Sequence, residues 1–378
     1  MMLSTSCDFI ERAIPGVRQL SPYQPGKPEA ELRRELGLTR IVKLASNENP
    51  LGASPLAIAA VQAAAADLAR YPDGNGYALK QALATRLNVA PECITLGNGS
   101  NDILELLGRA YLGSGRNAVF SEHAFAVYPL VVQAVNAQAR VVPALGDNSP
   151  MPYGHDLSAF QDYLDGDTAI IFIANPNNPT GTWLSSTALA DFLAQVPAHT
   201  LVVVDEAYTE YADAADYASV VPWLERWPNL VVTRTFSKAY GLAGLRVGYG
   251  VSHPDVANVL NRVRQPFNVN SLALCAAEAA LADTAFLDTS RAVNQQGLQQ
   301  LRAAMSLLNV RVLPSIANFL CIDVHRPSYP VFTQLLQKGI IVRPVANYGL
   351  PHALRVTVGT EAENDLLISA LTEVLATA

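Results

Sequence analysis

The sequence predicts an α/β protein in which a mostly parallel sheet, covered by helices, forms a large domain beside a smaller α/β domain. Short runs of apolar and β-branched residues alternate with longer segments of helical periodicity, which is the pattern of buried parallel strands joined through helices. Of the 378 residues, 16% are charged, against about 25% in an average globular chain. A large and well-covered core follows, and the length allows about two or three domains.

The first 45 residues are expected to form an arm rather than a domain. Prolines and glycines interrupt them repeatedly, and one charged helix is predicted at 29–36. This segment holds too little apolar material to build a core of its own, so we expect it to pack against the small domain. An alanine-rich helix at 55–70, a loop at 71–76 and a helix ending at residue 87 then open the large domain.

The large domain is expected to span residues 46–285 and the small domain residues 286–378. In the large domain we predict strands at 93–96, 118–121, 139–144, 169–174, 201–204, 230–233 and 247–251, with helices at 102–111, 128–136 and 185–195. A long helical stretch at 255–308 precedes further strands at 310–313, 319–323, 340–344 and 354–358, which alternate with helices. Ligands of mostly parallel sheets bind in the loops at the carboxyl ends of the strands.

Composition and spacing exclude several classes of function. A net charge of −7 without clustered Lys and Arg argues against a nucleic-acid-binding face. The four cysteines form no CxxC pair and the six histidines form no HExxH motif, so neither a disulfide framework nor a metal site is indicated. We find no signal-peptide pattern and no apolar run long enough to cross a membrane. We therefore expect a cytoplasmic protein.

Lys238 carries the strongest chemical signal in the chain. It follows the predicted strand at 230–233 and leads into a glycine-punctuated loop, so its amine should lie partly withdrawn from water. Desolvation lowers the pKa of an amine, and a neutral amine can attack a carbonyl group to form a Schiff base. The flanking residues Thr235, Ser237 and Arg246 offer hydroxyls and a guanidinium, which suit a phosphate monoester. This combination suggests pyridoxal 5'-phosphate; a solvated loop lysine is the alternative.

Polar residues at other predicted strand ends fit the same cofactor. Asp205 ends a strand, where it either caps the following turn or pairs with a protonated pyridine nitrogen. Asn178 and Tyr208 follow two strands and could hydrogen-bond the cofactor's phenolate oxygen. The segment 99–101 opens a helix, so its backbone N–H groups could hold a phosphate. This loop has neither the further glycine of a dinucleotide fingerprint nor a GK[ST] sequence, so by itself it is a weak signal.

Three motifs together resemble the fold-type I aminotransferases that use pyridoxal 5'-phosphate. They are Asn175-Pro-Asn-Asn-Pro-Thr-Gly181, Asp205-Glu-Ala-Tyr208 and Ser237-Lys-Ala-Tyr-Gly-Leu-Ala-Gly-Leu-Arg246. Within that group, similarity to histidinol-phosphate aminotransferases is carried by Leu44-Ala-Ser-Asn-Glu-Asn-Pro-Leu-Gly52, Arg70-Tyr-Pro-Asp73, Arg343 and Leu354-Arg-Val-Thr-Val-Gly359. The resemblance covers nearly the whole chain and implies the fold-type I architecture for the two predicted domains.

The resemblance implies a role in cofactor binding for each candidate residue. Lys238 would be the Schiff-base lysine, and Asp205 would pair with the pyridine nitrogen. The phenolate oxygen would be contacted by Asn178 and Tyr208. The implied phosphate ligands are Thr235, Ser237, Arg246, the backbone of Gly99, Ser100 and Asn101, and Tyr71 from the partner subunit of a homodimer. Phe125 stands where the family commonly has tyrosine; it could stack on the ring without a hydroxyl, or be a core residue.

The implied reaction is a ping-pong transamination in which L-glutamate and imidazole-acetol phosphate give 2-oxoglutarate and L-histidinol phosphate. Lys238 would act as general base and acid at the substrate's Cα. The implied substrate-binding residues are Tyr23, Asn47, Arg343 and Arg355. For the two arginines, surface salt bridges are the alternative, and for Asn47 the alternative is a turn.

Two other functions share these cofactor motifs: an aromatic amino-acid aminotransferase, and a decarboxylase of a phosphorylated amino acid. A transcription regulator that binds pyridoxal phosphate is disfavoured, because it would need a basic winged-helix module that the proline-rich arm does not resemble.

Overall fold

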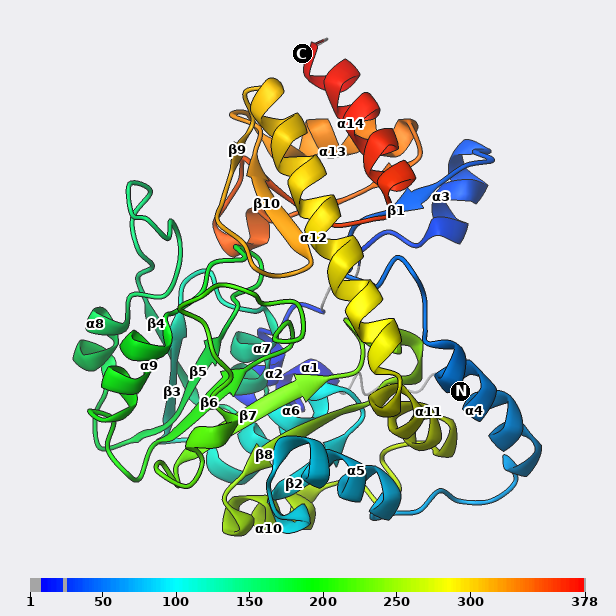
Figure 1. Ribbon diagram of the computed structural model, residues 1–378. Helices are drawn as coiled ribbons and strands as arrows, with labels where there is room; N and C mark the ends of the chain where they lie inside the picture. The colour runs from blue at the N-terminus through cyan, green and yellow to red at the C-terminus, as the bar shows by residue number, and fades with distance from the viewer. Residues whose placement is uncertain (1–7, 23–25, 377–378) are drawn as a thin grey trace, which may run out of the picture.

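A central sheet of seven strands organises the larger part of the molecule (Figure 1). The computed structural model describes residues 8–22 and 26–376. Within them the strand order is β2-β8-β7-β6-β5-β3-β4, formed by β2 (Ile94–Gly97), β3 (Asn117–Ser121), β4 (Gln138–Val142), β5 (Thr168–Ala174), β6 (Leu201–Asp205), β7 (Leu230–Thr235) and β8 (Gly248–Ser252). Neighbours from β4 to β7 run parallel, whereas β8 is antiparallel to β7 and β2. The mostly parallel sheet predicted from the sequence is confirmed.

Alternating side chains of these strands supply both faces of the sheet. On β6, Val203 packs in one core cluster, while Val202 and Val204 pack in another on the opposite face. Helices cover both faces: α6 (Ser100–Tyr111), α7 (Val127–Ala134) and α10 (Pro254–Val263) cover the first, and α8 (Leu157–Phe160) and α9 (Ser186–Leu193) the second. Burial on both sides explains why the strands appear in the sequence as continuous apolar runs.

The predicted helical stretch at 255–308 is divided into three helices. After α10, a segment containing Pro266 interrupts the helix, and the side chain of Asn270 caps α11 (Ser271–Ala282). Asp283 then caps α12 (Thr284–Leu307). α11 packs with α4 (Pro55–Ala64) and α5 (Tyr77–Leu87) in a third core cluster beside β2 and β8. Local capping chemistry therefore sets the boundaries that apolar periodicity did not.

A second, antiparallel sheet forms the smaller part of the molecule. Its order is β12-β13-β10-β9, formed by β9 (Arg311–Val312), β10 (Phe319–Asp323), β12 (Arg343–Pro344) and β13 (Ala353–Thr357). Its core cluster includes residues of α12, α13 (Ser328–Gln337) and α14 (Glu361–Ala376). α12 joins the two parts (Figure 1), because Leu287 packs in the cluster with α4 and α11, whereas Leu298 packs in the cluster of the smaller sheet. The boundary between 285 and 286 falls in its first turn and stays a prediction.

The amino-terminal arm adjoins both parts. α1 (Phe9–Arg12) precedes α2 (Pro15–Arg18), and α2 lies beside α7, where Gly16 N donates to Asn136 Oδ1 at 3.1 Å. Farther along, Leu32 of α3 (Glu29–Leu36) packs with Ile341, and β1 (Val42–Lys43) pairs in parallel with β11 (Ile340–Ile341). β1 and β11 form a separate two-stranded sheet, and Val42 packs in the core cluster of the smaller part, so the second half of the arm is tied to that part. In the described part of the chain, we find no helix with the length and apolar character to cross a membrane.

Candidate active site

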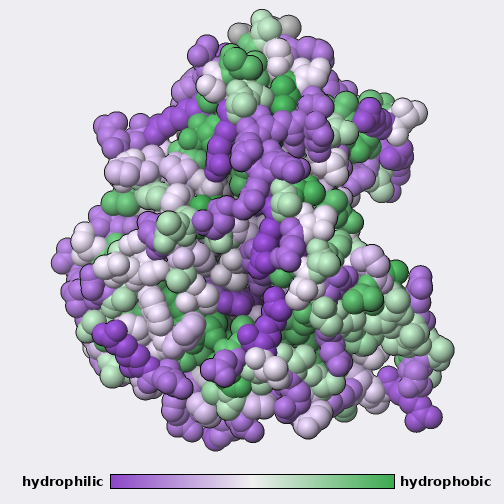
Figure 2. Space-filling view, in the orientation of Figure 1, coloured by the Kyte–Doolittle hydropathy of each residue, from purple (hydrophilic) through white to green (hydrophobic). Residues whose placement is uncertain are grey.

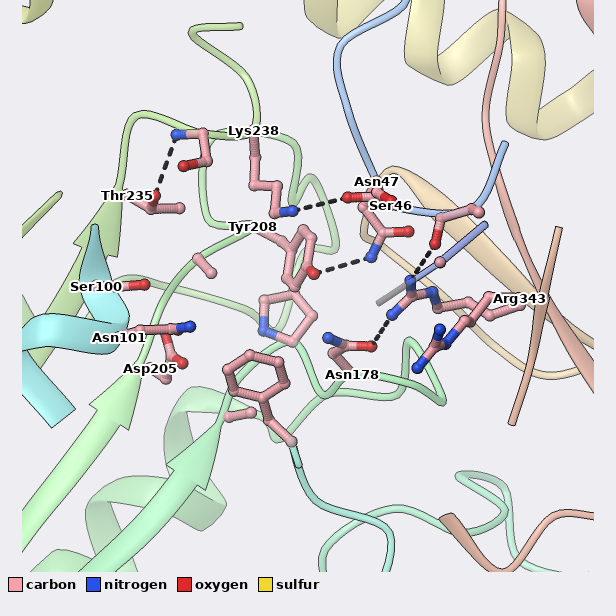
Figure 3. Close-up of a pocket in the computed structure, with 18 of the residues that line it drawn as sticks. Ser46, Asn47, Ser100, Asn101, Asn178, Asp205, Tyr208, Thr235, Lys238 and Arg343 are labelled. Atoms are coloured by element: carbon pink, nitrogen blue, oxygen red, sulfur yellow. Dashed lines mark hydrogen bonds between the residues drawn. The ribbon is translucent and has the colours of Figure 1, made fainter. Parts of the chain in front are cut away.

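A cavity of about 230 Å³ lies at the carboxyl ends of β5, β6 and β7, facing β12 and β13 of the smaller sheet (Figure 3). This is the edge at which mostly parallel sheets bind their ligands. The candidate residues that line it are Asn47, Ser100, Asn101, Phe125, Asn178, Asp205, Tyr208, Thr235, Ser237, Lys238, Arg246, Arg343 and Arg355. The structure therefore brings together residues from the turn after β1, from the large sheet and its loops, and from β12 and β13 of the smaller sheet.

Lys238 lies just past β7 and points across the cavity toward the turn that follows β1 (Figure 3). Its Nζ donates to Ser46 O at 2.9 Å and lies 6.0 Å from the centre of the Tyr208 ring. Burial lowers the pKa of the amine to about 8, and the positive charges of Arg355 and Arg246 act in the same direction. A lysine with this pKa has a larger neutral, nucleophilic fraction near neutral pH than an exposed lysine.

Asp205 ends β6 on the opposite side of the cavity, where its side chain is buried. Its Oδ2 accepts a hydrogen bond from Tyr128 Oη at 3.3 Å, whereas its Oδ1 has no partner among the described residues. Burial raises the pKa of this carboxyl to about 6. A buried carboxylate oxygen that lacks a donor is costly, so this atom indicates a ligand that brings one.

Tyr208 and Asn47 meet between the two parts of the molecule. Asn47 Nδ2 donates to Tyr208 Oη at 2.9 Å. Asn47 is itself anchored to the smaller sheet, because its backbone N–H donates to Thr357 Oγ1 at 2.9 Å and its carbonyl accepts from Asn318 Nδ2 at 3.0 Å. Its φ of 56° lies in the left-handed region that asparagine tolerates better than most residues. Burial raises the pKa of Tyr208 to about 12, so its phenol remains protonated.

Arg343 and Arg355 place two guanidinium groups at the same wall of the cavity. They are direct partners in the register of β12 and β13, so their side chains leave the sheet on one face. Arg355 is buried and donates to Asn178 Oδ1 at 2.6 Å and to Ala45 O at 2.5 Å, and its Nε has no partner among the described residues. Two guanidinium groups on one face of a sheet offer donors for a carboxylate or a phosphate.

A second anion site lies at the start of α6. The cavity-lining residues Ser100 and Asn101 form the first turn of this helix, whose free N–H groups and dipole favour negative charge. Arg246 Nη1 donates to Ser237 Oγ at 3.3 Å, and Ser237 N donates to Thr235 Oγ1 at 3.1 Å. Gly99 has φ +84°, and a Cβ there would lie 2.4 Å from Arg246 Nη2. Backbone and guanidinium approach this closely only because residue 99 is glycine.

The residues that hold the loop between β2 and α6 in place by hydrogen bonds were not predicted from the sequence. Asp102 Oδ2 accepts from Asn98 N at 2.8 Å and from Asn268 Nδ2 at 2.7 Å. Asn268 also accepts from Arg264 Nη1 at 2.7 Å and donates to Leu96 O at 3.1 Å. The network holds the end of β2 and the first turn of α6 in one arrangement. Asp102 follows Ser100 and Asn101 in an already polar helix start, so no local signal in the sequence indicated this network.

Among the described candidate side chains, that of Tyr71 lies away from the cavity. Tyr71 is 83% exposed and does not line the cavity; its ring stacks on Phe267 at 4.8 Å. Tyr23 lies outside the described residues. Phe125 lines the cavity and meets the ring of Tyr128 edge-on at 5.8 Å, so it is both a lining and a packing residue.

These groups fit pyridoxal 5'-phosphate. The unpaired Oδ1 of Asp205 would accept from the pyridinium N–H, and the amine of Lys238 would react with the aldehyde. The turn at Gly99–Asn101 with Arg246 and Ser237 would hold the phosphate. Among the described residues there is no group of three or more His, Cys, Asp or Glu side chains arranged to hold a metal ion.

Comparisons with known proteins point in the same direction. The family model of class I and II aminotransferases matches residues 39–371. A histidinol-phosphate aminotransferase 2 of Pseudomonas fluorescens is 60% identical over 375 residues, covering 99% of this chain and 100% of the relative. The Pseudomonas aeruginosa protein of the same name is 57% identical over 371 residues, covering 98% of this chain and 99% of the relative.

Among solved structures, the chain is similar to the histidinol-phosphate aminotransferase of Sinorhizobium meliloti in complex with pyridoxal 5'-phosphate. The TM-score is 0.89 at 30% sequence identity, and the match covers 97% of this chain and 98% of the other. At this coverage the likeness of the backbone includes both sheets.

Proposed function

Because this chain belongs to the class I and II aminotransferases, we propose that it is a pyridoxal-phosphate-dependent histidinol-phosphate aminotransferase. In this reaction of histidine biosynthesis, L-glutamate gives its amino group to imidazole-acetol phosphate, which yields L-histidinol phosphate and 2-oxoglutarate. The observation that carries the substrate assignment is the arginine pair, Arg343 opposite Arg355, at one wall of the cavity. Identity of 57–60% to relatives of this name over nearly the whole chain supports it.

The two substrates make different electrostatic demands on one pocket. Glutamate presents an α-carboxylate beside its amino group, whereas histidinol phosphate has no carboxylate and presents a phosphate dianion. A guanidinium binds either group with two parallel hydrogen bonds. The buried Arg355, already oriented by Asn178 and Ala45, would serve both substrates. Arg343 adds a second positive charge, which should favour the dianion over the monoanion.

The chain's own residues would perform the remaining steps. When bound, pyridoxal 5'-phosphate supplies a carbonyl group for the amino group and a ring that accepts the electron pair released at the substrate's Cα. Lys238 Nζ, with its lowered pKa, would take the proton from the substrate's Cα and deliver a proton to C4' of the cofactor. Asp205 Oδ1 would hold the proton on the ring nitrogen. Tyr208 Oη, oriented by Asn47, would donate to the phenolate oxygen.

We also propose that the chain works as a homodimer in the cytoplasm. Exposed apolar side chains lie on and after α4, where Leu56, Ile58 and Leu68 are 51%, 46% and 60% exposed. Figure 2 shows hydrophobic residues gathered over this part of the surface. The stacked pair Tyr71 and Phe267 is also exposed. Apolar surface of this kind commonly marks an interface, and a partner there would receive the Tyr71 hydroxyl at its phosphate site.

Half-reactions followed by the absorbance of the bound cofactor test the substrate assignment. The wild-type protein should react faster with histidinol phosphate than with L-phenylalanine, and should also react with L-glutamate. Arg343→Ala should lower kcat/KM for histidinol phosphate more than for glutamate, by about 1–3 kcal/mol, because a second cation matters more to the dianion. Arg109→Ala is the matched control, because Arg109 forms an exposed ion pair with Glu105. It should change kcat/KM for neither histidinol phosphate nor glutamate.

Three results would contradict the proposal. Faster reaction with phenylalanine, or equal losses for both substrates in Arg343→Ala, would favour an aromatic amino-acid aminotransferase. Release of carbon dioxide from a phosphorylated amino acid would favour a decarboxylase.

A further inference from the structure

We propose that Tyr128 is a positioning residue for the transamination: its hydroxyl holds one oxygen of Asp205 so that the other faces the ring nitrogen of the cofactor. The inference rests on the proposed function, because it concerns the carboxylate that would pair with pyridoxal 5'-phosphate. Tyr128 does not line the cavity and would act through Asp205.

Packing contacts hold the ring of Tyr128 in place independently of its hydroxyl. It lies in the first turn of α7 with no exposed surface. Phe172 of β5 stacks on it at 4.9 Å with an angle of 8° between the planes, and Phe125 meets it edge-on at 5.8 Å. Aromatic contacts of both kinds are favourable, so the ring has little freedom to turn. Its Oη is thereby delivered to a defined point 3.3 Å from Asp205 Oδ2.

The hydrogen bond makes the two oxygens of Asp205 different from each other. A carboxylate without neighbours can rotate about its Cβ–Cγ bond and exchange its oxygens. With Oδ2 held by Tyr128, Oδ1 is left as the acceptor without a partner among the described residues. The ring nitrogen of the cofactor would bring a single N–H donor, and Oδ1 would be the acceptor left for it.

The same hydrogen bond influences the charge of Asp205. Burial raises the pKa of the carboxyl to about 6. Thr233, Tyr128 and the backbone N–H of Ala207 oppose that change by favouring the ionised form, so Tyr128 supplies one part of this effect. The other titratable groups that influence or face Asp205 are Glu206, Tyr208 and Lys238. Glu206 pairs with Arg234. Without the Tyr128 hydroxyl, the carboxyl would be neutral over a wider pH range, and a neutral carboxyl pairs poorly with a pyridinium.

The test compares Tyr128→Phe, which removes one oxygen and keeps the ring contacts, with Tyr211→Phe as the matched control. Tyr211 is buried in the cluster with α4 and α11 and does not contact Asp205. The measurements are the affinity of the ligand-free protein for pyridoxal 5'-phosphate and the pH profile of kcat/KM. Tyr128→Phe should lose roughly tenfold in affinity near pH 6 and distinctly less near pH 8. The acid limb of its kcat/KM profile should move to higher pH. Tyr211→Phe should show neither the loss of affinity nor the shift of the acid limb.

The outcomes separate this inference from the proposed function. A wild-type protein that fails to bind pyridoxal 5'-phosphate, or binds it without transaminating, would overturn the proposed function and the inference with it. A wild-type protein that binds and transaminates, with an unchanged pH profile in Tyr128→Phe, would overturn the positioning role alone. A loss of equal size at both pH values would also overturn it, because a packing defect does not depend on the ionisation of Asp205.

Discussion

Burial of Asp205 destabilises the ligand-free fold whenever the carboxyl is ionised. Its pKa of about 6 in the folded chain lies above the ordinary value of 3.8, so the folded state binds the proton more tightly than the unfolded state. Tighter proton binding by Asp205 in the folded state therefore adds to the free energy of unfolding. This contribution is complete below the pKa of the unfolded state and is lost as the pH rises through about 6. At neutral pH the folded chain keeps a charged group that it would be more stable without.

Asp205→Asn should accordingly stabilise the ligand-free protein near neutral pH, by about 1–3 kcal/mol in the free energy of unfolding. The advantage over the wild type should shrink as the pH falls from about 6 toward 4, where the wild-type carboxyl becomes neutral as well. Urea unfolding of both proteins at several pH values measures this difference. Asp162→Asn, at an exposed carboxylate, is the control and should show no such trend. A difference in the free energy of unfolding between Asp205→Asn and the wild type that does not change with pH would contradict the inference that Asp205 is ionised at neutral pH in the folded, ligand-free protein.

The site residues that the sequence predicted share a local signal, and those it missed do not. Lys238 and Asp205 follow apolar strands, so their place at the edge of the sheet could be inferred from neighbouring residues. Tyr128 reaches a partner 77 positions away, and Asn268 reaches Asp102 across 166 positions. In the sequence, Tyr128 is one more aromatic residue at helical spacing. Tertiary packing alone turns its hydroxyl toward Asp205.

At the scale of elements, apolar runs predicted the buried strands well and the exposed or interrupted elements less well. β5 and β10 agree with the predicted ranges 169–174 and 319–323 to within one residue. β4 ends two residues before its prediction at 139–144; it lies at the edge of the sheet and is mostly exposed, so apolar content is a poor guide to its end. The stretch at 255–308 is mostly helical as predicted, but its division into three helices was not predicted, because periodicity does not register the caps at Asn270 and Asp283.

The loop between β2 and α6 allows a prediction about shape rather than charge. Gly99→Ala should fold but weaken the binding of pyridoxal 5'-phosphate at least tenfold, because the new Cβ displaces the guanidinium of Arg246. Gly115→Ala is a close control: both glycines have φ +84°, but a Cβ at 115 meets nothing within 4 Å. Each variant should lose about 1–2 kcal/mol of stability through backbone strain.

Affinity for the cofactor, measured by fluorescence titration, separates the two glycine variants. Gly115→Ala should bind like the wild type. Similar affinities in Gly99→Ala and Gly115→Ala would show that Arg246 does not hold the phosphate from its present position.

At the scale of the whole molecule, the site is assembled from parts that are far apart in the chain. Asn47, in the turn after β1, contacts Tyr208 after β6 and Thr357 of β13, so this wall of the cavity forms only when both sheets and this turn are in place. α12 spans the two core clusters and fixes their separation. Sequence patterns could predict the two sheets, but the contacts between them depend on packing across hundreds of residues.

The exposure of Tyr71 leads to a prediction about the assembly. If its hydroxyl completes the phosphate site of a partner subunit, Tyr71→Phe should weaken the binding of pyridoxal 5'-phosphate by about 1–2 kcal/mol, while its ring still stacks on Phe267. Tyr77→Phe, at another exposed tyrosine nearby in the chain, should leave the affinity unchanged. The affinity alone does not distinguish action within a subunit from action across an interface, so a hybrid dimer is needed.

Mixing Tyr71→Ala and Lys238→Ala subunits makes that distinction. In a hybrid dimer, the subunit that keeps Lys238 receives an intact Tyr71 from its partner, so one of its two sites is complete if Tyr71 acts across the interface. Random exchange makes about half of the dimers hybrid. At a pyridoxal 5'-phosphate concentration too low to load the Tyr71→Ala sites, activity should therefore rise from a low value to about a quarter of the wild-type value. If Tyr71 serves its own subunit, no hybrid site is complete and mixing restores nothing. A fully active monomer in sedimentation at the assay concentration would exclude the shared site directly.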